Sequence, residues 1–196
     1  MSAAAVTIDN RRQTRSGITV ALAGNPNAGK TTLFNFLTGL KQKVANYPGV
    51  TVERKAGVWK AGELTARLID LPGLYSLDTT SLDESISRDV LTGHIAGIER
   101  PDAIIAVVDA TNLERNLYLV TQLFEFGIPV VVALTMIDVF EKQKHQIDTE
   151  RLSELLHAPV VEIDVKRGRG KGKLVEAVNK VVRSTPAMPF VAETGN

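Results

Sequence analysis

The chain has 196 residues, of which 44% are hydrophobic and none is cysteine, and its formal net charge is +1. A chain of this length buries one substantial core, so we expect a single domain with tails rather than two full domains. The lack of cysteine excludes disulfides and thiolate metal sites, and the balanced charge gives no overall argument for nucleic acid or an anionic membrane.

The first part of the chain predicts a tail, a strand and a helix. Residues 1–16 have little apolar content and no periodicity, which predicts a flexible N-terminal tail. The continuous apolar run at about 17–23 is typical of a buried parallel strand. A helix is expected from about 29 to 38, ended by Gly39.

The next segment predicts a loop, a hairpin and a second helix. Residues 41–50 include Asn-Tyr-Pro-Gly, which indicates an exposed loop rich in turns. The segments 52–60 and 64–70 flank Ala-Gly-Glu and predict a hairpin, the only antiparallel pairing that we expect. Ser81 and Glu84 fit a capping box. It opens a helix on which three residues share one face: Leu82, Ile86 and Val90.

The second half of the chain alternates strands and helices. Buried strands are expected at 103–108, ending in Asp109, at 130–134 and at 160–163. A helix that ends at Gly127 is expected to face inward through Leu113, Leu117, Val120 and Phe124. A helix after Asp148 is expected to do so through Leu152, Leu155 and Leu156. The last helix is expected to face inward through Leu174, Val178, Val181 and Val182. The alternation predicts an α/β fold with a mostly parallel sheet, helices on both faces and ligands at the carboxyl ends of the strands.

A phosphate-binding pattern, GxxxxGK[ST], lies at residues 24–31 between the first strand and the first helix. Backbone N–H groups of such a loop surround phosphate oxygens, and the positive end of the helix adds to the attraction. Lys30 is expected to neutralise the outer phosphates, and Thr31 to hold Mg²⁺ through its hydroxyl. An ordinary glycine turn, the alternative, would not require Lys-Thr at this place. The predicted nucleotide contacts are Gly24, Asn25, Pro26, Asn27, Ala28, Gly29, Lys30, Thr31 and Thr32.

Two further segments are expected to reach the phosphates. Asp70 starts Asp-Leu-Pro-Gly after the third strand. Its carboxylate is predicted to hold Mg²⁺ through water, and the N–H of Gly73 to reach the γ-phosphate. In the loop before this hairpin, Thr51 is the candidate second hydroxyl ligand of Mg²⁺, beside predicted nucleotide contacts at Gly49 and Val50. The alternative for Thr51, a solvated threonine at the start of a strand, stays open.

A base-reading site is predicted after the strand at 130–134. Asp138 is placed to accept two hydrogen bonds from the edge of guanine, which adenine could not donate in the same way, so GTP is favoured over ATP. Thr135 and Met136 belong to the same predicted site.

Other polar groups are read as surface features. His94, His145 and His157 lack carboxylate partners at ligand spacing and are expected on the surface or in loops. The basic stretch 166–173 is expected to be a solvated loop, with contact to a phosphate backbone or an acidic partner as the alternative.

The segments GNPNAGKT, NYPGVTVER, DLPGLYSL followed by SLDESISRD, and TMID closely resemble the cytosolic G domain of the ferrous iron transport protein B (FeoB) family. The resemblance covers nearly all of residues 17–183. It implies a Ras-like P-loop GTPase fold whose six-stranded, mostly parallel sheet has one antiparallel edge strand. It also implies GTP hydrolysis with Mg²⁺, and a tether to a membrane domain that transports iron. We therefore expect a G domain at 17–184 between tails at 1–16 and 185–196.

The resemblance also assigns a potassium site. In this family the second asparagine of the phosphate loop, here Asn27, binds a K⁺ that supplies the charge of an arginine finger, and the loop at 46–49 adds backbone carbonyls. Leu74 stands where Ras-like enzymes keep a water-orienting glutamine, so backbone groups or distant polar residues, with Asp83 and Glu84 as candidates, must position the water. A slow, K⁺-stimulated GTPase is implied, with these catalytic residues: Asn27, Lys30, Thr51 and Gly73.

The chain departs from the family pattern in three places. Thr135 stands where the base-reading motif normally begins with asparagine. Asp164 and Val165, which we keep in the predicted base site, replace the usual Ser-Ala of the last guanine-contacting loop. The helical domain that usually follows has no room after Arg183, so either the chain is truncated or its natural architecture is shorter.

The expected partners are the guanine nucleotide, the C-terminal transmembrane domain of the full-length protein and other G domains by self-association, with no nucleic acid. The full-length protein would lie at the cytoplasmic face of the inner membrane. No apolar run approaches the roughly 18 residues that span a bilayer, so this fragment is expected to be soluble. Two alternatives remain: an RNA- or ribosome-associated GTPase of the Era or TrmE kind, and a weakly catalytic nucleotide-binding switch.

Overall fold

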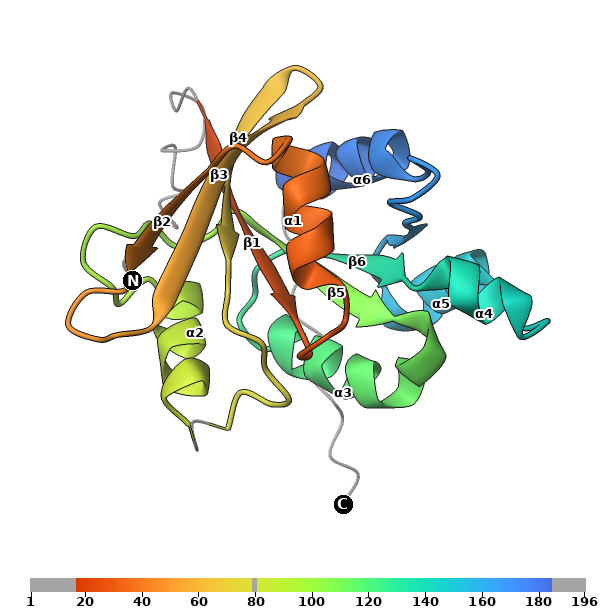
Figure 1. Cartoon of the computed structure of the whole chain (residues 1–196), viewed down its shortest axis with the longest axis horizontal. Coiled ribbons are helices and arrows are strands. Elements are labelled where there is room, and N and C mark those ends of the chain that lie inside the picture. The colour runs from red at the N-terminus through yellow and green to blue at the C-terminus, as the bar shows by residue number, and fades with distance from the viewer. Residues whose placement is uncertain (1–16, 79–80, 185–196) are drawn as a thin grey trace, which may run out of the picture.

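The computed structural model describes residues 17–78 and 81–184. Both predicted tails, 1–16 and 185–196, lie outside the described residues. In the described part, strands and helices alternate along the chain and form one sheet with helices on both faces (Figure 1). The predicted α/β class is therefore confirmed.

One sheet of seven strands organises the fold, in the order β2-β3-β4-β1-β5-β6-β7. The strands from β4 to β7 in this order run parallel, whereas β3 is antiparallel to both of its neighbours. The continuous apolar runs of β1, β5 and β6 are buried along nearly their whole length, as central parallel strands require. The strand bounds are β1 Ile18–Gly24, β2 Gln42–Asn46, β3 Glu53–Ala61, β4 Leu64–Asp70, β5 Ala103–Asp109, β6 Val130–Thr135 and β7 Val160–Glu162.

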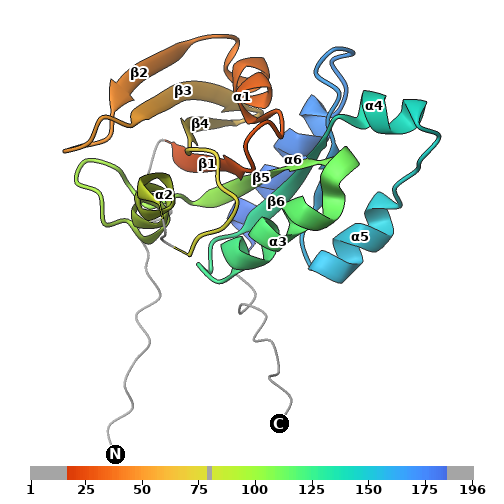
Figure 2. The same ribbon diagram turned by 60° about the horizontal axis from the view of Figure 1, so that its bottom comes forward.

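A hydrophobic core lies on each face of the sheet. The helices α1 (Lys30–Thr38) and α6 (Lys171–Arg183) cover one face. The other core receives side chains from α2 (Leu82–Thr92), α3 (Leu113–Phe124), α4 (Ile137–Lys142) and α5 (Thr149–Leu156). Figure 2 shows α2 and α3 on the opposite side of the sheet from α1. A short 3₁₀ helix, η2 (Ala110–Asn112), connects β5 to α3.

The predicted count of six strands is one too low. Residues 41–50, predicted to be a loop, contain β2, which pairs antiparallel with β3 from Gln42↔Gly57 to Asn46↔Glu53. Every residue of β2 is exposed, so this strand lacks the alternation that a sequence pattern detects. Because β2 takes the edge, the antiparallel strand β3 lies second from the edge, and there are two antiparallel pairings instead of one.

Local capping signals in the sequence are confirmed. The Ser81 hydroxyl accepts a hydrogen bond from the N–H of Glu84, whose carboxylate accepts one from the N–H of Ser81. Asp148 caps α5 by accepting a hydrogen bond from the N–H of Arg151 at 2.8 Å. These caps depend only on residues a turn apart, so the sequence predicts them directly.

Two leucines that were predicted to face the core do not. Leu82 is 53% exposed because it is the first residue of α2, at the end of the helix. Leu155 is 63% exposed because α5 packs on the core through Leu152 and Leu156, with none of its own residues fully buried. Helical periodicity therefore identified the helices but overestimated how wide their buried faces are.

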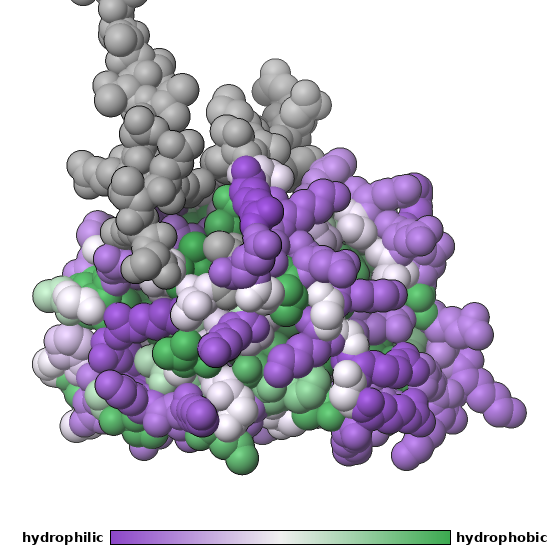
Figure 3. All heavy atoms as spheres, turned by 90° about the horizontal axis from the view of Figure 1, so that it is seen from above, coloured by the Kyte–Doolittle hydropathy of each residue, from purple (hydrophilic) through white to green (hydrophobic). Residues whose placement is uncertain are grey.

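One face of the molecule shows how polar its surface is. The face seen from above in Figure 3 is mostly hydrophilic, with small apolar patches between polar side chains. Within residues 17–78 and 81–184, no helix is long and apolar enough to cross a membrane. The same residues hold no group of three or more His, Asp or Glu side chains that could bind a metal ion. The three histidines are exposed, as predicted: His94, His145 and His157.

Candidate functional site

The phosphate-binding segment connects the carboxyl end of β1 to the start of α1. Gly29 is the N-cap of α1 and has a φ of 85°, in the left-handed region where a side chain would be strained. Asn27 also has a positive φ, 65°, and is exposed, as are Thr31 and Thr32 at the start of the helix. A helix leaves the N–H groups of its first turn without partners of its own, so this loop has the backbone arrangement that binds an anion.

The Lys30 ammonium joins this loop to the end of β4. Its Nζ donates to Asp70 Oδ1 at 2.6 Å and to the carbonyl oxygen of Leu71 at 2.6 Å. The side chains of Lys30 and Asp70 are only 11% and 7% exposed. The fold thus places together a cation suited to phosphate and a carboxylate suited to Mg²⁺, which are 40 residues apart in the chain.

The Asp-Leu-Pro-Gly segment lies against the phosphate loop. A Cβ added to Gly73 would lie 3.2 Å from the Cα of Pro26, so only glycine allows this approach without a shift. The N–H of Leu74 donates to the carbonyl oxygen of Gly24 at 3.1 Å. The Leu74 side chain is buried in the core beneath α2 and α3, where it cannot orient a water molecule.

Thr135 braces the same loop from the carboxyl end of β6. Its hydroxyl lies 2.6 Å from the carbonyl oxygen of Ala28 and 3.1 Å from that of Val108. The residue is 5% exposed, and its Cβ would lie 3.6 Å from a Cβ added to Gly29. A threonine hydroxyl has one hydrogen to donate, and the shorter contact goes to the loop. Thr135 is therefore part of the loop's support.

Asp138 has Lys166 as its ion-pair partner. The Lys166 Nζ donates to Asp138 Oδ2 at 2.8 Å, and this hydrogen bond lowers the pKa of Asp138 below its ordinary value. The same bond raises the pKa of Lys166. Asp138 is thus held in its ionised form, in which both carboxylate oxygens only accept hydrogen bonds.

The segment that includes Asp164 and Val165 folds on itself. Asp164 and Arg169 exchange two backbone hydrogen bonds, at 3.2 and 2.9 Å. The buried Asp164 carboxylate accepts a hydrogen bond from the N–H of Arg167 at 3.0 Å. Val165 packs on the core beneath α1 and α6. The Asp164 side chain therefore shapes this loop, and the ion pair of Lys166 with Asp138 joins the loop to α4.

Tyr47 anchors the loop that carries Gly49, Val50 and Thr51. Its carbonyl oxygen accepts a hydrogen bond from the N–H of Val50 at 3.2 Å. Its phenol is buried, which raises its pKa, and the hydroxyl lies 3.5 Å from the carbonyl oxygen of Asp70. Gly49 and Thr51 are exposed, and within the described residues no hydrogen bond joins Thr51 to the phosphate loop. Tyr47 therefore connects this loop to Asp70 of the site. The sequence predicted Tyr47 in an exposed turn, whereas its side chain is buried.

Carboxylates compensate the first part of the basic stretch 166–173, namely Lys166, Arg167 and Arg169. Besides the pair of Lys166 with Asp138, Arg167 lies 3.3 Å and Arg169 3.5 Å from carboxylate oxygens of Glu141. Glu141 belongs to α4, a six-residue helix that the sequence pattern did not predict. This part of the stretch is therefore not the free cationic surface that a phosphate backbone would require.

Two buried polar residues near the site differ in their hydrogen-bond partners. Asn25 is 4% exposed, and neither polar atom of its amide has a hydrogen-bond partner among the described residues. A buried amide of this kind is normally satisfied by water or a ligand, which fits a phosphate loop. Glu84, a candidate for positioning water, is buried and its carboxylate accepts hydrogen bonds from Ser81 and Ser76.

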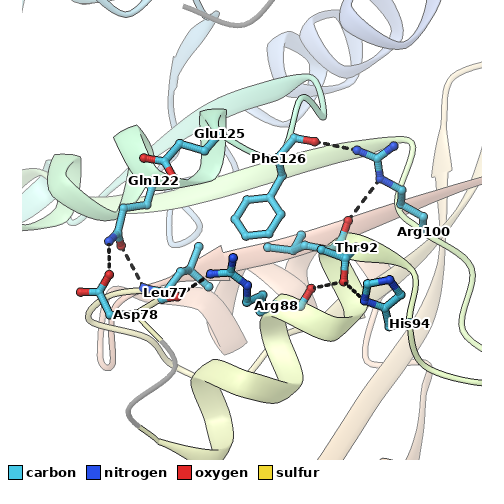
Figure 4. Close-up of a pocket in the computed structure, with 10 residues that line it drawn as sticks. Leu77, Asp78, Arg88, Thr92, His94, Arg100, Gln122, Glu125 and Phe126 are labelled. Carbon is cyan, nitrogen blue, oxygen red and sulfur yellow. Dashed lines mark hydrogen bonds between the residues drawn. The ribbon is translucent and has the colours of Figure 1, made fainter. Parts of the chain in front are cut away.

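A pocket of about 500 Å³ lies beside the segment that follows Gly73, between α2 and α3. Figure 4 shows Gln122 reaching from α3 to this segment. Its Oε1 accepts from the N–H of Leu77 at 2.9 Å, and its Nε2 donates to Asp78 at 3.1 Å. Arg88 of α2 donates to the carbonyl oxygen of Leu77 at 3.3 Å. These contacts attach the segment after Asp-Leu-Pro-Gly to two helices.

Comparison with known proteins agrees with this geometry. The family model of ferrous iron transport protein B matches residues 18–178. The Fe(2+) transporter FeoB of Salmonella typhimurium is 50% identical over 163 residues, which make up 83% of this chain and 21% of that protein. The chain thus spans about a fifth of the length of the curated relatives it matches.

Two solved structures from T. maritima resemble this fold. The cytosolic domain of the FeoB iron transporter in its GMPPNP form has a TM-score of 0.84 at 42% identity, and the match covers 91% of this chain and 69% of that one. The G domain of that transporter has a TM-score of 0.77 at 44% identity, and the match covers 85% of this chain and 99% of that one. The family match covers most of the sequence, including every strand and the whole phosphate loop, and the chain belongs to the ferrous iron transport protein B family.

Proposed function

We propose that this chain binds GTP and hydrolyses it to GDP and phosphate. The observation that carries the proposal is the convergence of Lys30, Asp70 and Gly73 on one phosphate-binding loop. Phosphoryl transfer depends on positioning and on stabilising negative charge, and a cation, a carboxylate and backbone N–H groups supply both. The T. maritima relative in its GMPPNP form supports a guanine nucleotide as the ligand.

The residues present fit Mg²⁺ and K⁺. Mg²⁺ prefers oxygen ligands, and the predicted set consists of the Thr31 and Thr51 hydroxyls with Asp70 acting through water. Asn27, exposed at a positive φ, would hold K⁺ by its side-chain oxygen. When bound, the two cations neutralise charge on the phosphates. The buried amide of Asn25 has no hydrogen-bond partner among the described residues, which supports the proposal that this loop holds polar ligands.

The chain's own groups act on the γ-phosphate. Water attacks the γ-phosphorus while the bond to the bridging oxygen breaks, so GDP leaves with that oxygen and the proton of the water goes to the released phosphate. The negative charge on the γ-phosphate oxygens faces Lys30 and the N–H of Gly73. Because Leu74 is buried, backbone groups of the loops at 46–51 and 70–73 orient the water. A site without a side chain for this task works slowly, so we infer a low intrinsic rate that K⁺ increases.

Guanine is selected by Asp138. Its carboxylate, kept ionised by Lys166, accepts from two donors on the guanine edge, which adenine cannot supply. Thr135, the last residue of β6, and Met136, the N-cap of α4, are proposed to support this site, and Asp164 and Val165 to close it from the loop after β7. The carboxylate partners of Lys166, Arg167 and Arg169 disfavour an RNA-associated role for this loop.

The domain is proposed to serve a larger protein. The relatives named Fe(2+) transporter extend well beyond the matched segment. We infer that residues 17–184 form a G domain whose nucleotide state regulates or drives ferrous iron uptake by a membrane domain. Its place is then the cytoplasmic face of the membrane, with self-association of G domains as a second contact.

Phosphate release from GTP, with ATP as the control substrate, tests the proposal. Lys30→Ala is expected to lower the rate at least about tenfold because the cation beside the phosphates is lost. Lys173→Ala, which removes an exposed lysine elsewhere, should keep the wild-type rate. Equal hydrolysis by all three proteins, or equal use of ATP and GTP, would overturn the proposal.

A further inference from the structure

The outer part of the sheet carries a groove of about 1070 Å³ that is lined by cations. We call it the basic groove and define it by Lys41, Lys43, Arg54, Lys60, Arg67 and Lys171. The other described residues that line it are uncharged, and no Asp or Glu is among them. The cations come from β2, β3, β4, the turn before β2 and the start of α6. No short stretch of sequence therefore reveals them as a cluster.

Strand register places four of these cations on one face of the sheet. Each faces an uncharged residue on the neighbouring strand, so no carboxylate lies directly across from it. The cross-strand pairs are Lys43 with Ala56, Arg54 with Ala45, Arg67 with Val58 and Lys60 with Thr65. The small partners leave room between the long cationic side chains. The face therefore combines positive charge with a recessed floor.

The charge of the basic groove is uncompensated. Within the described residues none of its six cations makes an ion pair. Lys171 donates to a backbone carbonyl of α1, and the Nε of Arg54 is buried without a hydrogen-bond partner in the described part of the chain. Lys166, Arg167 and Arg169, which look more basic in the sequence, have carboxylate partners instead. An unpaired cluster attracts anionic groups from solution.

We propose that the basic groove binds an acidic segment of a partner polypeptide. Carboxylates of such a segment match the cations in charge, and Val58, which is 59% exposed, offers apolar contact between them. A recessed site suits an inserted chain segment better than the flat surface of a bilayer. Among the described residues no aromatic side chain lines the groove, so these residues provide no stacking platform of the kind that single-stranded nucleic acid uses. Figures 1 and 2 show β2 as the outermost strand of the sheet.

Binding of a labelled peptide of alternating Glu and Gly tests this proposal, with the corresponding Gln and Gly peptide as its control. Fluorescence anisotropy at low and high salt gives the affinities. The triple variant Lys43→Gln, Lys60→Gln, Arg67→Gln is expected to weaken binding of the Glu peptide about tenfold, because three exposed charge contacts are lost. All three side chains are exposed and lie outside the nucleotide site, so GDP binding should stay unchanged and reports that the variant is folded.

A matched triple variant controls for net charge. Lys144→Gln, Lys173→Gln, Lys180→Gln removes three exposed cations outside the groove and should weaken binding less than about twofold. Equal losses in both variants would mean non-specific attraction and overturn the proposal, as would no binding of the Glu peptide to the wild type. Groove-dependent binding of phosphatidylserine vesicles or of single-stranded RNA, without binding of the peptide, would also overturn it.

Discussion

The hydroxyl of Thr135 lies 2.6 Å from the carbonyl oxygen of Ala28, and this contact ties the end of β6 to the phosphate loop. The family pattern expects asparagine at this position, and a longer amide would serve the loop and the base together. Thr135 has one hydrogen to donate, and its nearest acceptor is the loop. Although threonine departs from the family pattern, it keeps a hydrogen bond to the phosphate loop.

Thr135→Val is expected to loosen the phosphate loop. The substitution keeps the shape but leaves the buried Ala28 carbonyl without its donor, which costs about 1–3 kcal/mol of unfolding free energy. Labelled GDP should bind several-fold more weakly, whereas Thr135→Ser, which keeps the hydroxyl, should lie close to the wild type. Denaturant unfolding and GDP titration measure both effects. Wild-type behaviour of Thr135→Val would show that the hydrogen bond contributes nothing.

Asp138→Asn should move preference from guanosine toward xanthosine nucleotides. Xanthine presents an acceptor where guanine presents its amino group, so an amide that donates suits it better. Lys166→Gln, which removes only the partner, should keep the preference for guanosine. Competition of GDP and xanthosine diphosphate against labelled GDP compares the three proteins. An unchanged preference in Asp138→Asn would place the base elsewhere.

The ion pair of Asp138 with Lys166 predicts a pH effect of known sign. The hydrogen bond from Lys166 lowers the folded-state pKa of Asp138 below 3.8, its ordinary value. The stabilisation is therefore complete above the ordinary pKa and is lost as the pH falls through the lower folded-state pKa. Lys166→Gln should move the titration of Asp138 to higher pH, as followed by the NMR shift of its carboxyl carbon. The same midpoint in both proteins contradicts this cause.

Hydrolysis of GTP should be faster in K⁺ than in Na⁺. Asn27 and the backbone carbonyls at 46–49 are expected to form a site suited to the larger ion. Asn27→Ala should remove most of the difference between the two chloride salts while still binding GDP, because the rest of the phosphate loop is retained. Phosphate release in each salt gives the comparison. Equal wild-type rates in the two salts would exclude the potassium site.

Thr51→Ala should bind GDP normally and lose hydrolysis. Thr51 is exposed, and its hydroxyl is expected to join the site only when a γ-phosphate orders its loop. Thr65→Ala, at an exposed position of β4 outside the predicted nucleotide site, provides a control for a lost surface hydroxyl. Affinity for GDP and for a non-hydrolysable GTP analogue separates binding from hydrolysis. A wild-type rate in Thr51→Ala would support the alternative of a solvated strand-start threonine.

The sequence by itself determined the elements whose signals are local. The phosphate loop, the caps at Ser81 and Asp148, and the buried strands β1, β5 and β6 depend on neighbouring residues or on continuous apolar runs. These features were predicted within a residue or two of their bounds. Asp70 was also predicted at its strand end, because Asp-x-x-Gly follows a strand in the expected order.

Only the tertiary structure decided which groups meet across the sheet. Exposed β2 has no periodicity of its own and exists because β3 offers a backbone to pair with. Lys30 finds Asp70, and Thr135 finds Ala28, over separations of 40 and 107 residues. Glu141 compensates Arg167 and Arg169, while the cations of the basic groove make no ion pair among residues 17–78 and 81–184. Charge compensation depends on distances in space, and parallel strands joined by crossovers bring together residues that sequence spacing keeps apart.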